Sequence, residues 1–252
     1  MSNLINELME TTFKQSRLSL ARGAFIDEDV NLENSSIYIA KQKQGEYFIY
    51  LFVDENQLDL VTKDIQIRLS AFIKEQIESF EQLTETPVEI DQSFDKNSTL
   101  IISTVYEVRF NDSIKRRVIE IEEDPYFFKK QVIAISQTEL SHVQARFEEF
   151  QADFIAYLRV TISDVSKFMA FSDSNNLGLS NDGIEYKFVA SMYEKLPFLT
   201  LDVEEAKQDN LQLKIEQNLS SEKIVLRNEL LSFDENSVDQ WIDAIAREVN
   251  DD

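Results

Sequence analysis

Acidic residues and a lysine near the middle of the second half of the chain have a spacing that could support catalysis. Asp182, Glu185 and Lys187 repeat the acid, Glu-x-Lys pattern with which restriction-type nucleases hold a divalent metal ion and position a base, and Asp173 offers a second acid upstream. In a chain this rich in Glu and Lys the pattern is expected by chance, and the surrounding residues favour a helix over a strand. A metal-dependent nuclease is therefore an alternative function, and the less favoured one.

A second acidic group lies directly before a proline. Glu120, Glu122, Glu123 and Asp124 carry oxygen ligands of the kind that Mg²⁺ and Ca²⁺ prefer. Apolar and acidic residues alternate here, which predicts a strand that Pro125 ends because proline has no N–H for the ladder. A strand would place Glu123 on the opposite face from Glu120 and Glu122, so a solvated strand end is favoured over a metal site.

Other catalytic chemistry is poorly supplied by the composition. The chain has no cysteine and a single histidine, His142, which leaves thiol nucleophiles, cysteine metal sites and histidine-rich sites without residues. Its four glycines are scattered, and no glycine-rich phosphate loop occurs. We expect no catalytic residues, no bound metal and no cofactor.

The charge balance limits the partners. Forty-seven acidic residues against twenty-five basic ones give a net charge of -22, which repels phosphate backbones. We expect no direct nucleic-acid binding by this chain alone. The acidic surface suits a basic partner, and a DNA mimic that inhibits a basic cleft is a further alternative. No run of eighteen apolar residues and no leader-like segment is present, so we expect a cytoplasmic protein without a membrane segment.

Three consecutive aromatic residues, Tyr126, Phe127 and Phe128, stand between the acidic group and Lys129 and Lys130. They cannot all point into one core. Either some of them contact another chain, or they hold the turn against the helix predicted for residues 136–159.

The elements that must position these residues indicate an α+β fold. We predict an N-terminal mixed or antiparallel sheet covered by long amphipathic helices, followed by a smaller C-terminal α+β or helical region. The predicted elements, in chain order, are a helix at 3–15, an irregular stretch at 16–35 with room for one short strand, a hairpin of strands 37–41 and 47–53 around Gly45, a helix from about 58 to 83, strands at 99–108 and 132–135, and a helix to about 158 that begins with a capping box of Ser136 and Glu139.

The composition changes after residue 164, which suggests a domain of residues 1–160 and a C-terminal region of residues 165–252. A helix at 184–196 ends before Pro197, and a short strand or an extended piece covers 198–203. Residues 211–226 fit two strands or one broken helix. The last helix carries Trp241 and Ile245, which either fold back onto their own domain or dock to a partner chain.

The segment EIEEDPYFFKKQVI resembles the middle component of bacterial ABC-ATPase three-component conflict systems, which overlap with Lamassu-type anti-phage and anti-plasmid systems. The resemblance covers Ile119 to Val132 closely and residues 36–155 loosely, and Gln131 stands where that pattern often has an aromatic. It implies a non-catalytic accessory subunit that links an SMC-like or ABC-type ATPase to a nuclease-like effector and helps to restrain or activate that effector. The residues expected at partner contacts are Asp124, Pro125, Tyr126, Phe127, Phe128, Lys129, Lys130, Trp241 and Ile245.

Overall fold

The structure is a computed structural model that describes residues 2–27, 32–92, 94, 96–107, 112–173, 179–201, 223, 225, 227 and 228. The chain divides into two compact units, residues 1–201 and residues 202–252. The helices and strands named below belong to the first unit.

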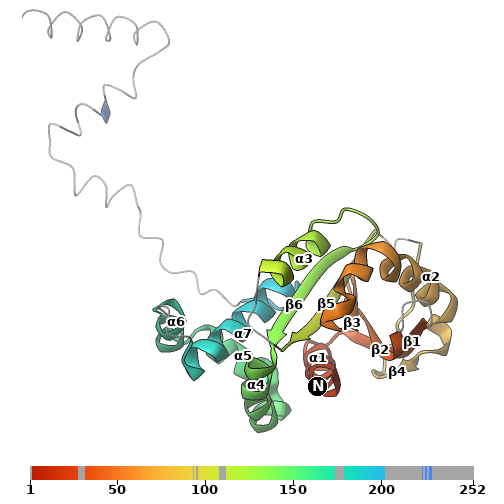
Figure 1. The fold of residues 1–252 in the computed structure, drawn as a ribbon, viewed down its shortest axis with the longest axis horizontal. Coiled ribbons are helices and arrows are strands. Elements are labelled where there is room, and N and C mark those ends of the chain that lie inside the picture. The colour runs from red at the N-terminus through yellow and green to blue at the C-terminus, as the bar shows by residue number, and fades with distance from the viewer. Residues whose placement is uncertain are drawn as a thin grey trace, which may run out of the picture. The chain divides into compact units, whose positions relative to one another are not determined.

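A six-stranded mixed sheet forms the centre of the described part of the first unit (Figure 1). Its strands are β1 (Ser19–Asp27), β2 (Leu32–Lys41), β3 (Tyr47–Phe52), β4 (Glu81–Gln82), β5 (Ser98–Tyr106) and β6 (Lys129–Ser136), in the spatial order β4-β1-β2-β3-β5-β6. β1, β2 and β3 form an antiparallel meander, whereas β3, β5 and β6 run parallel. This sheet and its helices confirm the predicted α+β class.

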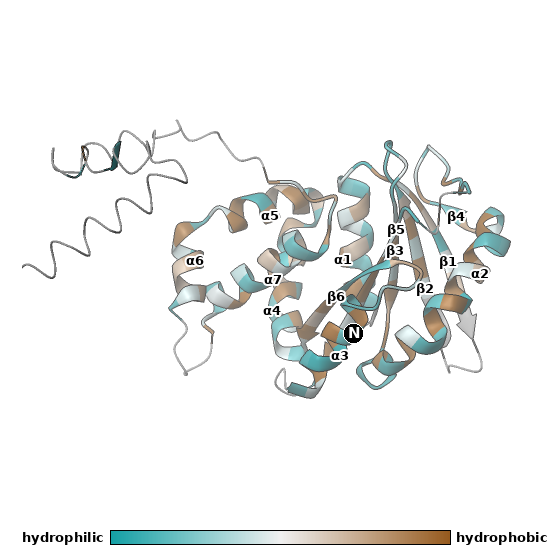
Figure 2. Ribbon diagram, turned by 90° about the horizontal axis from the view of Figure 1, so that it is seen from above, coloured by the Kyte–Doolittle hydropathy of each residue, from teal (hydrophilic) through white to brown (hydrophobic). Residues whose placement is uncertain are grey.

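Helices cover both faces of the sheet, and their apolar sides face it (Figure 2). The α-helices are α1 (Ser2–Gln15), α2 (Gln66–Gln76), α3 (Asp112–Glu122), α4 (Gln137–Phe150), α5 (Phe154–Ile162), α6 (Val165–Ser172) and α7 (Asn181–Lys195), and the short 3-10 or π segments are η1 (Glu55–Leu60), η2 (Val61–Ile65), η3 (Ile77–Ser79) and η4 (Gln151–Asp153). α2 and α3 contribute to the core on one face, and α1, α4, α5 and α7 contribute to the core on the other.

The central strands are apolar on both sides because both faces of the sheet are covered. In β3, Ile49 and Leu51 belong to the core beneath α2, whereas Phe48 and Tyr50 belong to the core beneath α1. Parallel neighbours require a crossover connection between them. The segment containing α2 supplies it between β3 and β5, and α3 supplies it between β5 and β6.

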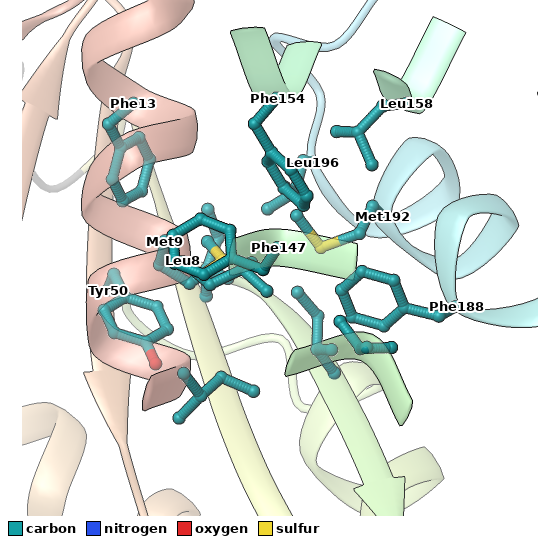
Figure 3. Close-up of a cluster of buried hydrophobic side chains, with 14 of the residues drawn as sticks. Leu8, Met9, Phe13, Tyr50, Phe147, Phe154, Leu158, Phe188, Met192 and Leu196 are labelled. Atoms are coloured by element: carbon teal, nitrogen blue, oxygen red, sulfur yellow. The ribbon is translucent and has the colours of Figure 1, made fainter. Parts of the chain in front are cut away.

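The N-terminal helix predicted at 3–15 is present as α1, and it packs on its own domain. Leu8, Met9 and Phe13 of α1 are buried in the core that also contains Phe147 of α4 and Met192 of α7, and Leu8 and Met9 lie beside Phe147 (Figure 3). α7 therefore shares a core with α1, although the sequence-based division placed it in the C-terminal region. The domain boundary predicted near residues 160–165 stays a prediction.

The predicted strand before Pro125 is wrong, since residues 112–122 form helix α3. Ile114 and Ile121 are buried and Val118 is partly buried, which is the i, i+4, i+7 spacing of one helix face. Ile119, the apolar residue that completes the apparent alternation, is exposed. The parallel pairing of β5 with β6 explains the outcome, because the chain must return along the sheet before it starts β6.

The irregular stretch predicted for residues 16–35 is also wrong, because it contains all of β1 and the start of β2. Gly23 in β1 faces the ring of Phe80, and a Cβ added to this glycine would lie 2.5 Å from the ring. The glycine reads as a loop signal in the sequence, but here it makes room for an aromatic side chain from a distant segment.

Two predicted helices are interrupted. The helix expected to reach residue 83 ends near Ser79, so that Glu81 and Gln82 can pair with β1. The helix after the capping box breaks at η4, and the Asp153 side chain then accepts from the backbone N–H of Ala156 and starts α5.

Several smaller predictions are confirmed. Gly45 has a φ of +93° in the β2–β3 loop, and Ser136 with Glu139 forms the capping box of α4. α7 ends at Lys195, before Pro197. Residues 198–201 are not extended into a strand, and residues 202–203, the alternatives for 211–226 and the terminal helix lie wholly or largely outside the described residues.

Candidate functional site

The DPYFFKK segment (residues 124–130) connects α3 to β6, and its anchor is Lys130. The side chain of Lys130 is fully buried, and its Nζ donates to the backbone carbonyl oxygens of Asp124 at 3.0 Å, Tyr126 at 2.5 Å and Phe128 at 3.1 Å. One ammonium group thus satisfies three carbonyls of the same short turn. A lysine with three donors is suited to this task because each N–H finds an acceptor.

Asp124 completes this anchor. Its Oδ2 lies 2.9 Å from Lys130 Nζ, and Gln66 of α2 donates to the same oxygen at 2.9 Å. Burial raises the pKa of Asp124, but the hydrogen bonds from Lys130 and Gln66 outweigh burial, so its pKa is lowered from the ordinary aspartate value. We call Asp124, Lys130 and Gln66 the Lys130 cluster. Asp124 is ionised at neutral pH and balances the buried ammonium.

The three aromatic residues divide between the interior and the surface. Phe128 is buried, and its ring centroid lies 6.2 Å from that of Phe94 in the core beneath α2. Tyr126 and Phe127 point outward, with 68% and 48% of their surfaces exposed. The prediction that the three cannot share one core is confirmed by this division.

Phe127 has an unusual backbone. Its φ is +61°, the left-handed region that glycine adopts freely and other residues rarely do. Pro125 and Lys129 are exposed on the same segment. The four exposed residues, Pro125, Tyr126, Phe127 and Lys129, form what we call the aromatic loop face.

The acidic residues before Pro125 do not converge on one point. Glu122 accepts from the backbone N–H of Val132 at 2.8 Å and lies 2.9 Å from Lys195 of α7, whereas Glu120 pairs with Arg116 on the exposed side of α3. Within the residues that the structure describes, no group of three or more His, Cys, Asp or Glu side chains could hold a metal ion. Glu122 instead ties α3 to β6 and α7.

The Glu-x-Lys pair of the nuclease alternative is also separated. Glu185 is 1% exposed, lies 2.5 Å from Lys167 Nζ and 3.5 Å from Arg146 Nε, and accepts from the Tyr157 hydroxyl at 2.7 Å. Lys187 lies 2.5 Å from Glu139 instead. The two residues therefore have different partners, and this geometry lends the nuclease site no support.

We call Glu185, Tyr157, Lys167 and Arg146 the Glu185 cluster. Burial raises the pKa of Glu185, but hydrogen bonds from Lys167 and Tyr157 outweigh it, so the pKa is lowered. Burial and the neighbouring carboxylate raise the pKa of the Tyr157 hydroxyl, which remains a donor. The cluster joins α4, α5, α6 and α7 through one carboxylate.

Sequence reasoning missed the residues that support the DPYFFKK segment from elsewhere. Gln66 lies 58 positions before Asp124, and Phe94 lies in the loop before β5. No local pattern marks either residue, since each is defined only by the packing of its segment against the turn. Trp241 and Ile245, the other predicted contacts, lie outside the described residues.

The fold and this site define a class of protein: an α+β domain, built on a mixed sheet, that presents an anchored aromatic loop. Residues 46–158 match the model of the family described as ABC-three component (ABC-3C) system Middle Component 1, MComp1. The matched segment runs from the start of β3 into α5 and contains all of residues 124–130. It covers a little under half of the chain and supports an ABC-3C middle component.

Searches of curated proteins and of solved structures gave no significant match. Within the described residues, no helix is long and apolar enough to cross a membrane.

Proposed function

We propose that this chain is a non-catalytic accessory subunit of an ABC-three-component defence system. In this proposal it links an SMC-like or ABC-type ATPase to a nuclease-like effector, and it helps to restrain or activate that effector, as in Lamassu-type anti-phage and anti-plasmid systems. The family match over residues 46–158 supports the middle-component part of this role. The aromatic loop face is the surface that we assign to partner contact.

The observation that carries the assignment is the exposure of Tyr126 and Phe127 on a turn that is fixed from below. Aromatic side chains are favoured anchors at protein interfaces, because each buries a large area while immobilising few torsions. The Lys130 cluster holds the backbone of the turn before any partner arrives, so less conformational entropy is lost on binding.

Phe127 adds a second argument. A non-glycine residue in the left-handed region costs about 1–3 kcal/mol. Full burial of the Phe127 side chain does not offset this backbone cost, because 48% of its surface is exposed. Burial of the ring against another chain would supply a stabilising contact that the folded chain alone does not supply.

The test is co-expression of the chain with the genes beside its own, followed by affinity capture at low and at high salt and mass spectrometry of the captured proteins. We expect a coiled-coil ATPase and a third protein, both retained at high salt because an apolar contact is not screened. The double variant Tyr126→Ala/Phe127→Gly should lose at least one of them. Ile67→Ala is the matched control, since Ile67 has the same 48% exposure on α2 within the matched segment.

Three outcomes contradict the proposal. Capture of the chain alone removes the bridging role. Partners that are lost at high salt and unaffected by the double variant point to the acidic surface, as a DNA mimic would. Partners that are lost with Phe168→Ala but kept in the double variant place the contact on α6, where Phe168 is also exposed, and overturn the assignment to the aromatic loop face.

A further inference from the structure

A cavity of about 610 Å³ lies where the end of α1, the β2–β3 loop and residues 84–89 meet. Four cationic residues line it, Lys14, Arg17, Lys41 and Lys43, together with two acidic residues, Glu85 and Glu89. The chain as a whole has a net charge of -22. A cavity in which cations outnumber carboxylates therefore departs sharply from the rest of the composition.

Two of the four cations are already engaged. Lys14 Nζ lies 2.7 Å from Glu10, and Lys41 Nζ donates to the backbone carbonyl of Glu89 at 2.7 Å and stands 4.9 Å from the ring centroid of Tyr47. The side chains of Arg17 and Lys43 form no ion pair and no hydrogen bond with any residue that the structure describes. Their charges are free to meet an anion in the cavity.

The backbone of Arg17 is a separate observation. Arg17 follows the C-terminus of α1 with a φ of +59°. Its N–H donates to Lys14 O at 3.1 Å, and the N–H of Leu18 donates to Phe13 O at 3.5 Å, which is the hydrogen-bond pattern of a Schellman cap. Glycine is the usual residue at this position, because an L side chain is strained there. An arginine here carries a backbone cost that its fold does not require.

Arg17 also borders a second cavity of about 620 Å³, which Ser16 and Arg159 line. The hydroxyl oxygen of Ser16 is buried and has no hydrogen-bond partner among the described residues. A strained arginine between two cavities and an unsatisfied hydroxyl beside it indicate that the polar groups of this region complete their interactions with something other than this chain.

We propose that the cavity of Arg17 and Lys43 binds a small phosphate-bearing ligand of nucleotide size. Arginine recognises phosphate with paired N–H donors and lysine adds a point charge. The volume falls within the range of small-molecule sites, about 300–1,000 Å³. A nucleic-acid strand fits less well, since the charge of -22 opposes a long phosphate backbone. Tyr126 and Phe127 do not line this cavity, so the site is independent of the proposed partner contact.

The test uses the purified full chain, titrated calorimetrically with pyrophosphate and, separately, with ATP at constant ionic strength. We expect saturable binding of both probes. Arg17→Gly and Arg17→Ala should each weaken binding by about tenfold or more, the loss of a charge-assisted hydrogen bond. Lys43→Gln should weaken it by a smaller factor, and Lys115→Gln on α3 is the control that should bind as the native chain does.

Unfolding in urea separates this role from a structural one. Arg17→Gly should have an unfolding midpoint at or above that of the native chain, and Arg17→Ala a lower midpoint than Arg17→Gly, because only glycine relieves the backbone. Absence of pyrophosphate and ATP binding overturns the proposal, as does unchanged binding in both Arg17→Ala and Lys43→Gln. Binding of single-stranded DNA that depends on Arg17, without binding of either small probe, overturns it in favour of nucleic acid.

Discussion

The Lys130 cluster and the Glu185 cluster use the same chemistry for different purposes. In the first, the buried group is a cation, and its acceptors lie within six residues of it along the chain. The side chain that reaches this cluster from a distant segment, Gln66, donates to Asp124. In the second, the buried group is a carboxylate, and its partners come from three other helices. The first cluster fixes a turn that displays two aromatic side chains. The second holds helices together.

This difference shows how a motif can mislead or inform. DPYFFKK is a local unit in which Asp124 at one end pairs with Lys130 at the other. A short stretch of sequence therefore contains both partners of the interaction. Glu-x-Lys is a pair whose members turn to unrelated partners, Glu185 to α5 and α6 and Lys187 to Glu139 of α4. Spacing along the chain has chemical meaning only where the backbone brings the spaced residues together.

The largest effect is expected from Lys130→Met. The substitution leaves Asp124 as a partly buried carboxylate without its cation and leaves three carbonyls without their donor, which should lower the free energy of unfolding by about 3–5 kcal/mol. Urea denaturation measures it. The adjacent Lys129→Met is the control, because Lys129 is exposed and its loss should change the free energy by less than about 0.5 kcal/mol. Equal effects of the two substitutions would refute the anchoring role.

The double variant Asp124→Asn/Lys130→Met sharpens this prediction. Removing the charge of Asp124 takes away most of the penalty that Lys130→Met creates. The double variant should therefore be more stable than the sum of the two single effects implies, by about 0.5–3 kcal/mol. A double-mutant cycle in urea gives this coupling energy, and a value near zero would show that the ion pair is not the source of the effect.

Glu185→Gln should cost less, about 1–3 kcal/mol. The amide oxygen can still accept from Tyr157, and Lys167 and Arg146 are partly exposed and can reach water. Urea denaturation again provides the measurement, with Lys187→Gln as a control that removes a charge two residues away on α7. An equal loss of unfolding free energy in Glu185→Gln and Lys130→Met would contradict the expectation that Lys130 contributes more to stability than Glu185.

The stability supplied by Glu185 should depend on pH. Its pKa is lowered in the folded protein from the ordinary value of 4.5, so the folded state binds its proton less readily than the unfolded state does. The contribution is therefore complete above the unfolded pKa and is lost as the pH falls through the folded pKa. The difference in unfolding free energy between the native chain and Glu185→Gln should shrink between pH 7 and pH values below 4.5. A difference that stays constant over this range would contradict the lowered pKa.

The smallest effect is expected at Phe127. Phe127→Gly relieves the left-handed backbone and should leave the free energy of unfolding unchanged or raise it by about 1 kcal/mol. Phe127→Ala removes the same ring without relieving the backbone and should be less stable than Phe127→Gly. The comparison of the two in urea isolates backbone strain from side-chain contacts, and equal stabilities would mean that the turn is not strained.

Local sequence patterns were sufficient where one segment contains its own physical cause. The helix at 3–15, the strand at 47–53, the loop at Gly45 and the Ser136–Glu139 capping box were all predicted and are all present. The pattern failed at residues 112–122, where a helix with exposed Ile119 imitates an alternating strand over a few positions. It failed again at Gly23, whose neighbour Phe80 is far away in the chain.

The sequence by itself determined the α+β class, the central strands, and the segment in which aromatic residues would have to divide between core and surface. Tertiary structure alone decided which of them turned outward, because that depended on the burial of Phe128 against Phe94 and on the capture of three carbonyls by Lys130. It also brought Arg17, after the end of α1, and Lys43, in the β2–β3 loop, to one cavity. The periodicity of apolar residues indicates which face of a helix or strand is buried. A site, in contrast, requires particular side chains to lie close together, and they do so only after the helices have packed on the sheet.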